Sequence, residues 1–462
     1  MTGQTTGHAA RLAPDSLGFA LDQAAQVVQA VREGTALPAA LMHRFTTLNP
    51  AQLAASRGAM QDIAYRAMRR LGLADWLLHE RVRKPPAPFL ANLLTCAFAL
   101  LTDDENAAAW APFTVVDQAV RAVGARRGTA FAKGMVNAVL RGFLRERGAL
   151  LAAAGHDEVA RWNYPQWWLD ALRAAWPDAW QSILETGNVA GPLTLRVNAR
   201  RLTVAACLTR LRAARIDAIQ IGRHAVRLAV PLPVERIPGF VDGDVSVQDA
   251  GAQLAAPLLE ARDGMRVLDA CAAPGGKTCH LLELADLDLI ALENDAVRAA
   301  RISENLARLG LSAQIVIGDA GTPDAWHDGQ PFDRILVDAP CSASGIVRRH
   351  PDIRWLRRAS DIGALVARQR RILAALWPLV KPGGELLYAT CSVFPDEGEK
   401  QAQWFEHAHA DAVRLGFYGQ LLPLARASTQ NVISDGIPEV DDCADHDGFF
   451  YALFRKLQKQ KR

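Results

Sequence analysis

The stretch Met265–Thr278, MRVLDACAAPGGKT, decides the fold of this chain. An apolar run is followed by Ala, Pro and two glycines, which predicts a buried strand that feeds a tight loop at the start of a helix. Gly275 and Gly276 let the backbone come close to a ligand, and the helix that follows offers free N–H groups to an anion or a carboxylate. The sequence therefore predicts a ligand site at this loop.

Three later stretches follow the same plan, an apolar run that ends in polar or reactive residues. They are LIALEND (289–295), RILVDAPCSASG (334–345) and LLYATCS (386–392). We predict strands near 265–270, 288–292, 314–317, 333–338 and 384–389, helices between them, and a last antiparallel strand over 448–456. This alternation predicts a parallel sheet with helices on both faces, in which the strand ends line one crevice.

The residues on the N-terminal side of the predicted sheet show a different pattern of apolar residues. Ala and Leu recur at helical spacing through the first 150 residues, and short alternating stretches appear around 223–230. We therefore predict a multidomain protein with a disordered tail over 1–16 and an all-α domain over 17–155. A small α+β connecting domain over 156–245 and an α/β Rossmann-like domain over 246–462 complete it.

The composition is that of an ordinary globular protein, with 22% charged residues and a net charge of +3. Its seven cysteines form no C-x-x-C pair, which argues against a zinc or other metal site and for reduced thiols in a cytosolic protein. No apolar run reaches the roughly 18 residues of a membrane span, and the N-terminus lacks a secretory pattern. We expect a cytoplasmic protein that does not bind membranes and acts as a monomer.

A basic surplus distinguishes the first third of the chain. Residues 1–150 hold 17 Lys and Arg against 11 Asp and Glu. Such a surplus suits RNA as a partner, but a solvated helix surface explains it equally well. Five tryptophans over 162–180 are able to stack on bases, but at helical spacing they more often belong to a core. Further candidates for RNA contact are Arg141, Arg145, Arg147, Arg196, Arg200 and Arg201.

The GGKT at 275–278 resembles the end of a phosphate-binding loop, but it fails the test for one. That loop requires glycine five residues before its last glycine, and this position is Cys271. The acids at the next strand ends point to another ligand. Glu293 lies 18 residues past Gly275 and suits the two hydroxyls of a ribose. Asp319, which ends the third strand, suits an adenine amino group.

These features together imply a nucleoside with a charged tail. The G-x-G-x-x-G that holds a dinucleotide pyrophosphate is missing. S-adenosyl-L-methionine fits, since it carries a ribose, an adenine and an amino-acid tail that would lie near the loop. The plain alternative is that the two acids are a helix cap and a surface charge.

Two cysteines end neighbouring strands of the predicted sheet. Cys341 follows Asp338–Ala339–Pro340, and Cys391 follows Thr390. A thiolate that attacks carbon 6 of cytosine makes carbon 5 nucleophilic enough to take a methyl group. The carboxylate of Asp338, beside N3 and the amino group of the base, would stabilise the charge that develops. The residues alone do not decide which cysteine attacks.

The set CAAPGGKT, GDA, DAPCSASGIVRRHPDIRW and YATCSV, with the closing DGFFYA, resembles the RNA cytosine-5 methyltransferases. Within them it is similar to the group that methylates cytosine 967 of 16S rRNA. The resemblance covers nearly the whole chain. It implies an RNA-binding helical domain similar to the antitermination factor NusB, a small connecting domain and a Rossmann-like class I methyltransferase domain. It also implies S-adenosyl-L-methionine as cofactor and 16S rRNA as partner.

The same resemblance implies a role for each site residue. Cys391 is the nucleophile, Cys341 assists release of the methylated RNA, and Asp338 faces both cofactor and base. Glu293 binds the ribose, although the family usually carries Asp there, and Asp319 lies near the adenine. Lys277 is also a catalytic residue. The loop that holds the methionine end of the cofactor comprises Cys271, Ala272, Ala273, Pro274, Gly275, Gly276 and Lys277.

Three alternatives remain open at this point. The chain could be a cytosine-5 methyltransferase for another RNA such as tRNA, which sequence separates only through the resemblance. A non-catalytic RNA-binding assembly factor would need neither the loop nor the two cysteines. A methyltransferase for exocyclic amines typically carries [DN]-P-P-[YF] where this chain has Asp338–Cys341, without the second proline and the aromatic residue.

Overall fold

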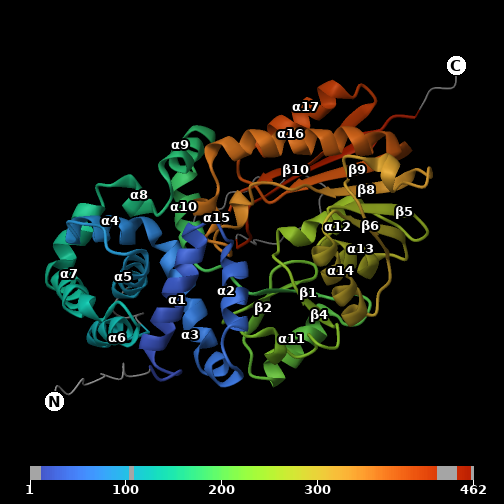
Figure 1. Ribbon diagram of the computed structural model, residues 1–462. Coiled ribbons are helices and arrows are strands. Elements are labelled where there is room, and N and C mark those ends of the chain that lie inside the picture. Colours follow the sequence, from blue (N-terminus) through green and yellow to red (C-terminus); the bar gives the residue numbers. More distant parts are fainter. Residues whose placement is uncertain (1–11, 104–108, 424–444, 459–462) are drawn as a thin grey trace, which may run out of the picture. The chain divides into compact units, whose positions relative to one another are not determined.

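The computed structural model describes residues 12–103, 109–423 and 445–458 of the 462. Residues 1–11 of the tail predicted over 1–16 lie outside them, as does Cys443. The chain divides into two compact units (Figure 1). Unit 1 comprises Met1–Ala171 with His350–Arg357, and unit 2 comprises Leu172–Arg349 with Arg358–Arg462.

Unit 1 is built from helices, as predicted. Ser16 caps the first of them by accepting a hydrogen bond from the Phe19 N–H at 3.2 Å, and Asn49 and Gln52 form a capping box at the start of α3. The helices are α1 (Leu17–Arg32), α2 (Leu37–Thr46), α3 (Pro50–Arg69), α4 (Leu71–Arg81), α5 (Pro88–Leu101), α6 (Pro112–Ala125), α7 (Lys133–Ala154), α8 (Glu158–Trp162) and α15 (Ile353–Leu356). Helix α9 (Gln166–Ala175) spans the boundary between the units.

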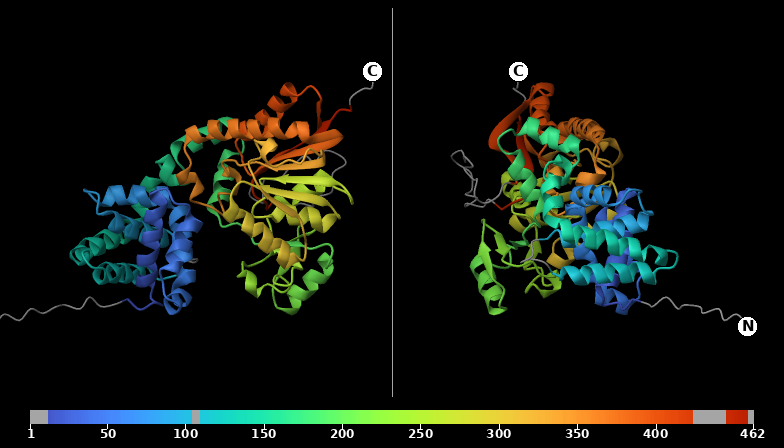
Figure 2. Two further views of the ribbon diagram at one scale, coloured as in Figure 1. Left: turned by 45° about the vertical axis from the view of Figure 1, so that its right-hand side comes forward. Right: turned by 90° about the vertical axis from the view of Figure 1, so that its left-hand side faces the viewer.

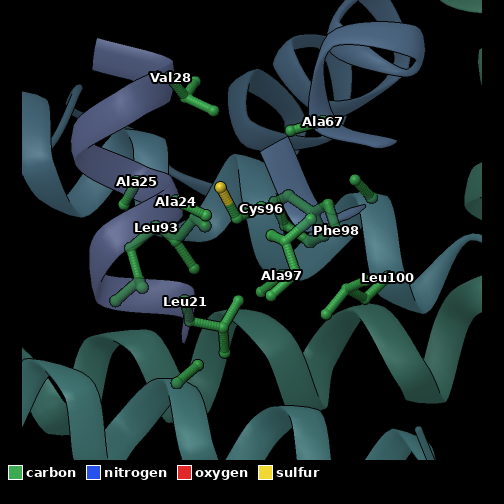
Figure 3. Packing of buried hydrophobic residues seen from close by; sticks show 14 of the residues in the cluster. Leu21, Ala24, Ala25, Val28, Ala67, Leu93, Cys96, Ala97, Phe98 and Leu100 are labelled. Carbon is green, nitrogen blue, oxygen red and sulfur yellow. The ribbon is translucent and has the colours of Figure 1, made fainter. Parts of the chain in front are cut away.

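Helix α5 lies at the centre of unit 1, because its sequence PFLANLLTCAFALL is apolar on every side and almost all of it is buried. Neighbouring helices pack their apolar stripes around it. Figure 3 shows part of this core, with residues of α1 and α3 beside those of α5. The labelled side chains are Leu21, Ala24, Ala25, Val28, Ala67, Leu93, Cys96, Ala97, Phe98 and Leu100.

The segment His350–Arg357 belongs to unit 1 although it follows strand β8 (Phe332–Asp338) of unit 2 in the chain. The carboxylate of Asp352 accepts a hydrogen bond from the Leu37 N–H at the start of α2 (2.8 Å). The indole N–H of Trp355 donates to the Met68 carbonyl (2.8 Å), and the guanidinium of Arg354 lies 3.8 Å from the centre of the Tyr164 ring. This part of the RRHPDIRW stretch therefore stabilises the helical unit.

The small sheet of unit 2 has the antiparallel order β2-β3-β1-β4. It follows α10 (Trp180–Asn188), and α11 covers its inner face with Cys207 and Leu211. Figure 2 shows it in green, close to α14 of the same unit, where Arg201 donates to the Leu309 carbonyl (2.6 Å). The elements are β1 (Thr194–Val197), α11 (Val204–Ala213), β2 (Ala218–Gln220), β3 (Ala225–Leu228) and β4 (Val245–Val247).

The large sheet of unit 2 has seven strands in the order β10-β11-β9-β8-β5-β6-β7. Strands β5 to β9 are parallel, and β11 is antiparallel to β9. The order reverses beside β5, which pairs with both β6 and β8, so the carboxyl ends of these strands form a switch point. The strands are β5 (Arg266–Ala270), β6 (Asp288–Glu293), β7 (Gln314–Ile317), β8 (Phe332–Asp338), β9 (Val380–Thr390), β10 (Ala412–Leu421) and β11 (Phe449–Lys456).

Helices cover both faces of this sheet (Figure 1). One face packs against α12 (Ala255–Leu259), α13 (Gly276–Leu284) and α14 (Ala296–Leu309). The other packs against α16 (Ala359–Leu376) and α17 (Glu399–Ala408). The doubly wound architecture and the final antiparallel strand are confirmed, whereas β10 is a strand that the sequence did not predict.

The burial of the tryptophans over 162–180 supports the core interpretation for two of the five. Trp162 and Trp168 are buried and the other three are partly buried. The RNA-contact prediction for Arg196 is wrong, because this side chain is 1% exposed and ion-paired. Arg147 donates to the backbone carbonyls of Leu101 and Asp103, whereas Arg141 and Arg145 are exposed. No helix in the described part of the chain is long and apolar enough to cross a membrane.

Candidate active site

The loop between β5 and α13 has the tight form that its sequence predicts. Gly275 has φ +95°, and a Cβ there would lie 3.2 Å from the Ile302 Cα, so conformation and space both require glycine. The Ala272 N–H donates to the Leu292 carbonyl of β6 (2.9 Å). Together these contacts hold residues 271–277 against the carboxyl ends of β5 and β6.

Glu293 lies at the end of β6, the strand end that the sequence predicts for it. Its side chain is 1% exposed and accepts hydrogen bonds from the Ala273 N–H (3.2 Å) and the Asn294 N–H (3.0 Å). Arg298, at the start of α14, lies 3.4 Å from the same carboxylate. The acid is therefore fixed beside the loop by both backbone and charge.

Asp319 follows β7 and is more open to solvent. It accepts from the Gly321 N–H and from Arg371, both at 2.9 Å. Burial opposes ionisation, but these two donors lower the pKa of Asp319 below its ordinary value. Asp319 is a stable negative group after β7, and strands β6 and β5 separate β7 from β8.

Asp269 is a buried acid that the sequence analysis did not single out. Its Oδ2 accepts from the Thr278 hydroxyl (2.6 Å), while its Oδ1 is buried without a hydrogen-bond partner. Burial raises the pKa of Asp269 to about 7. The only signal in the sequence is a carboxylate inside an otherwise apolar strand, directly before the ligand loop.

Lys277 and Asp338 form the charged centre of the site. The Lys277 Nζ lies 2.6 Å from the Asp338 Oδ2, and the lysine side chain is 12% exposed. Burial alone would lower the pKa of Lys277, but the negative charge of Asp338 and its hydrogen bond with the lysine outweigh burial and raise the pKa. The lysine therefore stays protonated and fixes the carboxylate at the end of β8.

The two cysteines meet as their positions at neighbouring strand ends predict. The Cys341 Sγ lies 3.5 Å from the Cys391 Sγ. The contact with Cys391 and burial raise the pKa of the Cys341 thiol well above its ordinary value. Cys391 is more exposed than Cys341. The site thus pairs a thiol that keeps its proton with a more accessible one.

Cys271 lies in the same neighbourhood but has a different character. Burial and the negative charges of Asp338 and Glu293 raise the pKa of the Cys271 thiol to about 12. At neutral pH it is a neutral, partly buried lining group and not a nucleophile.

Two residues of unit 2 that hold this site together escaped the sequence analysis as site residues. Arg196 of β1 donates to the Gly276 carbonyl (2.7 Å) and to the Glu283 carboxylate, so it anchors the start of α13. Glu397 accepts hydrogen bonds from Ser342 and Ser392, which directly follow the two cysteines. Within the described residues, no three His, Cys, Asp or Glu side chains group in a way that could hold a metal ion.

A family model and curated relatives match this chain. The 16S rRNA methyltransferase RsmB/F model matches residues 256–455, and the ferredoxin-like domain model of RsmF/B-like methyltransferases matches residues 164–235. The ribosomal RNA small subunit methyltransferase B of Pseudomonas syringae pv. tomato is 40% identical and covers 88% of this chain and 90% of its own. This chain belongs to the RsmB/F methyltransferase family. Its cofactor class is S-adenosyl-L-methionine.

Another relative and two solved structures are similar to this chain. The ribosomal RNA small subunit methyltransferase B of Cronobacter sakazakii is 38% identical over 94% of this chain and 97% of its own. The crystal structure of PH0851 shares the fold over 97% of this chain and 100% of its own, with a TM-score of 0.73 and 23% identity. A methyltransferase homologue from Pyrococcus horikoshii is 28% identical, with a TM-score of 0.54, over 65% of this chain and 98% of its own.

Proposed function

We propose that this chain transfers a methyl group from S-adenosyl-L-methionine to carbon 5 of cytosine 967 in 16S rRNA, through a covalent adduct between Cys391 and carbon 6 of the base. It does so as a cytoplasmic monomer. The observation that carries this proposal is the pair of cysteine sulfurs 3.5 Å apart at the ends of two neighbouring strands. The Lys277–Asp338 ion pair lies beside them.

The residues at the strand ends fit the cofactor. When bound, S-adenosyl-L-methionine would supply an electrophilic methyl group and, as its sulfur–methyl bond breaks, leave as S-adenosyl-L-homocysteine. Glu293 would accept from the ribose hydroxyls and Asp319 from the adenine amino group, since both are acids at successive strand ends. The loop 271–277 and Lys277 would hold the methionine end. The unpartnered, buried Asp269 Oδ1 is an acceptor available beneath that loop.

The cysteines divide the work on the base. The Cys391 thiolate adds to carbon 6 of cytosine, and the electron pair of the 5,6 double bond becomes available at carbon 5 for bonding to the methyl carbon. Asp338, held by Lys277, accepts a hydrogen bond from the amino group and so orients the ring, and the protonated Lys277 beside it offsets the negative charge that the addition places on the ring. After transfer a base removes the carbon-5 proton, the double bond reforms and the Cys391 thiolate leaves.

The assignment of attack to Cys391 and of release to Cys341 has support in the site. Cys391 is the more exposed sulfur, so a base can reach it. The raised pKa of Cys341 keeps its proton in place beside the adduct, where a thiol can assist departure of the product. The base must be flipped or already single-stranded, since attack occurs on the face of the ring.

RNA binding is proposed for the helical unit and the exposed basic residues of α7. Arg141 and Arg145 are exposed there, whereas Arg147 is committed to backbone carbonyls. Contacts of this kind are with phosphates, so affinity for RNA should fall as salt rises.

The proposal is tested by mapping the methylated base. Wild-type protein and Cys391→Ala are incubated with labelled S-adenosyl-L-methionine and, separately, with 16S rRNA and tRNA. We expect a single 5-methylcytosine at position 967 of 16S rRNA with wild type and none with Cys391→Ala. Methylation of tRNA alone, methylation of an exocyclic amine, or binding of rRNA without any transfer would each overturn it.

A further inference from the structure

Glu397 is a fully buried acid that lies outside the residues so far assigned to the reaction. It ends the 3₁₀ turn Pro395–Glu397, and its relative exposure is 0%. A carboxylate in such a place is costly unless its oxygens are fully hydrogen-bonded. The hydrogen bonds that the Glu397 carboxylate accepts therefore indicate its role.

The donors to Glu397 come from the residues that directly follow the two cysteines. Its Oε1 accepts from the Ser342 N–H at 2.8 Å. Its Oε2 accepts from the hydroxyls of Ser342 and Ser392, the latter at 2.7 Å. Ser342 is the neighbour of Cys341, and Ser392 is the neighbour of Cys391. One carboxylate thus joins the loop after β8 to the loop after β9.

Further hydrogen bonds tie the same two loops together around this carboxylate. The Ser344 Oγ lies 2.9 Å from the Ser392 Oγ and accepts from the Val393 N–H at 2.9 Å. The Gly345 N–H donates to the Cys391 carbonyl, also at 2.9 Å. The two loops therefore form one hydrogen-bonded unit, with Glu397 as its charged acceptor.

Glu397 is itself fixed from α16 through its carboxylate and from β9 through its backbone carbonyl. Gln369 of α16 donates through Nε2 to the Glu397 carboxylate and to the Pro340 carbonyl, both at 3.1 Å. The Tyr388 hydroxyl of β9 donates to the Glu397 carbonyl at 2.8 Å. All the groups directed at the carboxylate are N–H or O–H donors, which an ionised acid satisfies and an amide or protonated acid does not.

We propose that Glu397 is a positioning residue that sets the separation of the Cys341 and Cys391 sulfurs. The two thiols must act in turn on one base, and catalytic groups need to be held within fractions of an ångström of their working geometry. The catalytic consequence rests on the proposed cytosine-5 function. The geometric claim, that Glu397 holds the two sulfurs at 3.5 Å, does not.

The test uses the full-length protein, the variant Glu397→Gln and the matched control Glu399→Gln. Glu399 lies two residues further along and pairs with Arg414 (2.7 Å), away from the cysteines. Each protein is treated with 4,4′-dithiodipyridine. The first thiol displaces one thiopyridone and forms a mixed disulfide; the second thiol displaces the other thiopyridone and closes the Cys341–Cys391 bond. Peptide mass mapping then measures the rate of that bond.

We expect Glu397→Gln to slow formation of this disulfide at least about tenfold, and Glu399→Gln to leave it at the wild-type rate. In methylation assays Glu397→Gln should lower kcat by about tenfold or more while KM for S-adenosyl-L-methionine stays near wild type. A lowered kcat with an unchanged KM distinguishes displaced sulfurs from general damage to the fold. The cofactor loop is held by hydrogen bonds with Glu293 and Arg196, which the Glu397 substitution leaves in place.

A wild-type disulfide rate in Glu397→Gln overturns the geometric claim, whatever its activity. A slowed disulfide with unchanged kcat overturns the catalytic one. If wild type forms the disulfide but methylates no cytosine, the proposed function fails. The comparison of disulfide rates between wild type and Glu397→Gln still decides the geometric claim. If Glu397→Gln does not fold, Ser392→Ala, which removes one donor, should slow the disulfide in the same direction; an unchanged rate there refutes the proposal.

Discussion

Replacing Arg196 with Met should strongly destabilise unit 2, because it would leave a buried carboxylate unpaired. Arg196 and Glu283 are each 1% exposed in their side chains, and they form two hydrogen bonds, at 2.9 and 2.6 Å. Arg196 also donates to the Gln248 side chain and the Gly276 carbonyl, both at 2.7 Å.

The size of the effect follows from this burial. Removing one partner of a buried ion pair typically costs about 3–5 kcal/mol, since the other charge stays desolvated. For a domain of this size each kcal/mol corresponds to about 2 °C, so the Tm should fall by about 6–10 °C. Replacing both charges with apolar residues of similar volume is often neutral, so Arg196→Met with Glu283→Met should recover most of the loss.

Urea unfolding and thermal scans of wild type, both single variants and the double variant measure this directly. Loss of the donor to Gly276 should in addition weaken binding of S-adenosyl-L-methionine in calorimetry, even where the protein is still folded. A cost below about 1 kcal/mol for Arg196→Met, or a double variant no more stable than the single one, would refute the reasoning.

Two further predictions concern the same domain. The pKa of Asp269 is about 7 in the folded protein against 3.8 ordinarily, so its stabilising contribution is complete below pH 4 and is lost as pH rises through 7. The wild-type free energy of unfolding should therefore fall by up to about 4 kcal/mol from this group between pH 4 and 8, and Asp269→Asn should remove that fall. The same pH dependence in the variant would contradict this prediction. A Cβ on Gly345 would lie 2.2 Å from the Gly448 carbonyl oxygen, so Gly345→Ala should cost about 1–3 kcal/mol and slow methyl transfer by shifting its bond to Cys391. Gly363→Ala, at an exposed position of α16, is the matched control, because nothing lies within 4 Å of a Cβ at that position; equal stability of the two variants would count against the steric account.

The sheet and its active edge were predictable from sequence for a physical reason. Parallel strands are buried on both faces, so they read as apolar runs, and the chemistry begins where each run ends. Cys341 and Cys391 are separated by 50 residues, yet both follow such a run, and the structure brings their sulfurs together. In this fold β8 lies between β5 and β9, so the residues that follow these three strands meet at one edge of the sheet.

The contacts that support the site were not predictable in the same way. Arg196 looks like a basic surface residue, and only the packing of the small sheet on α13 buries it against Glu283. Glu397 lies in a polar stretch that is typical of a loop, and one of its partners, Ser342, comes from the end of a different strand. Strand β10 was missed because its sequence, AVRLGFYGQL, is interrupted by glycines, and pairing with β11 overrides that weak propensity.

The most direct test of the central claim is a covalent adduct assay. Wild type, Cys391→Ala and Cys341→Ala are incubated with 16S rRNA and S-adenosyl-L-methionine, and protein–RNA bands are resolved on a denaturing gel. The account predicts that Cys341→Ala accumulates the adduct, because attack proceeds and release fails, and that Cys391→Ala forms none. An adduct, or methylated cytosine, formed by Cys391→Ala would contradict the assignment of the nucleophile and the mechanism built on it.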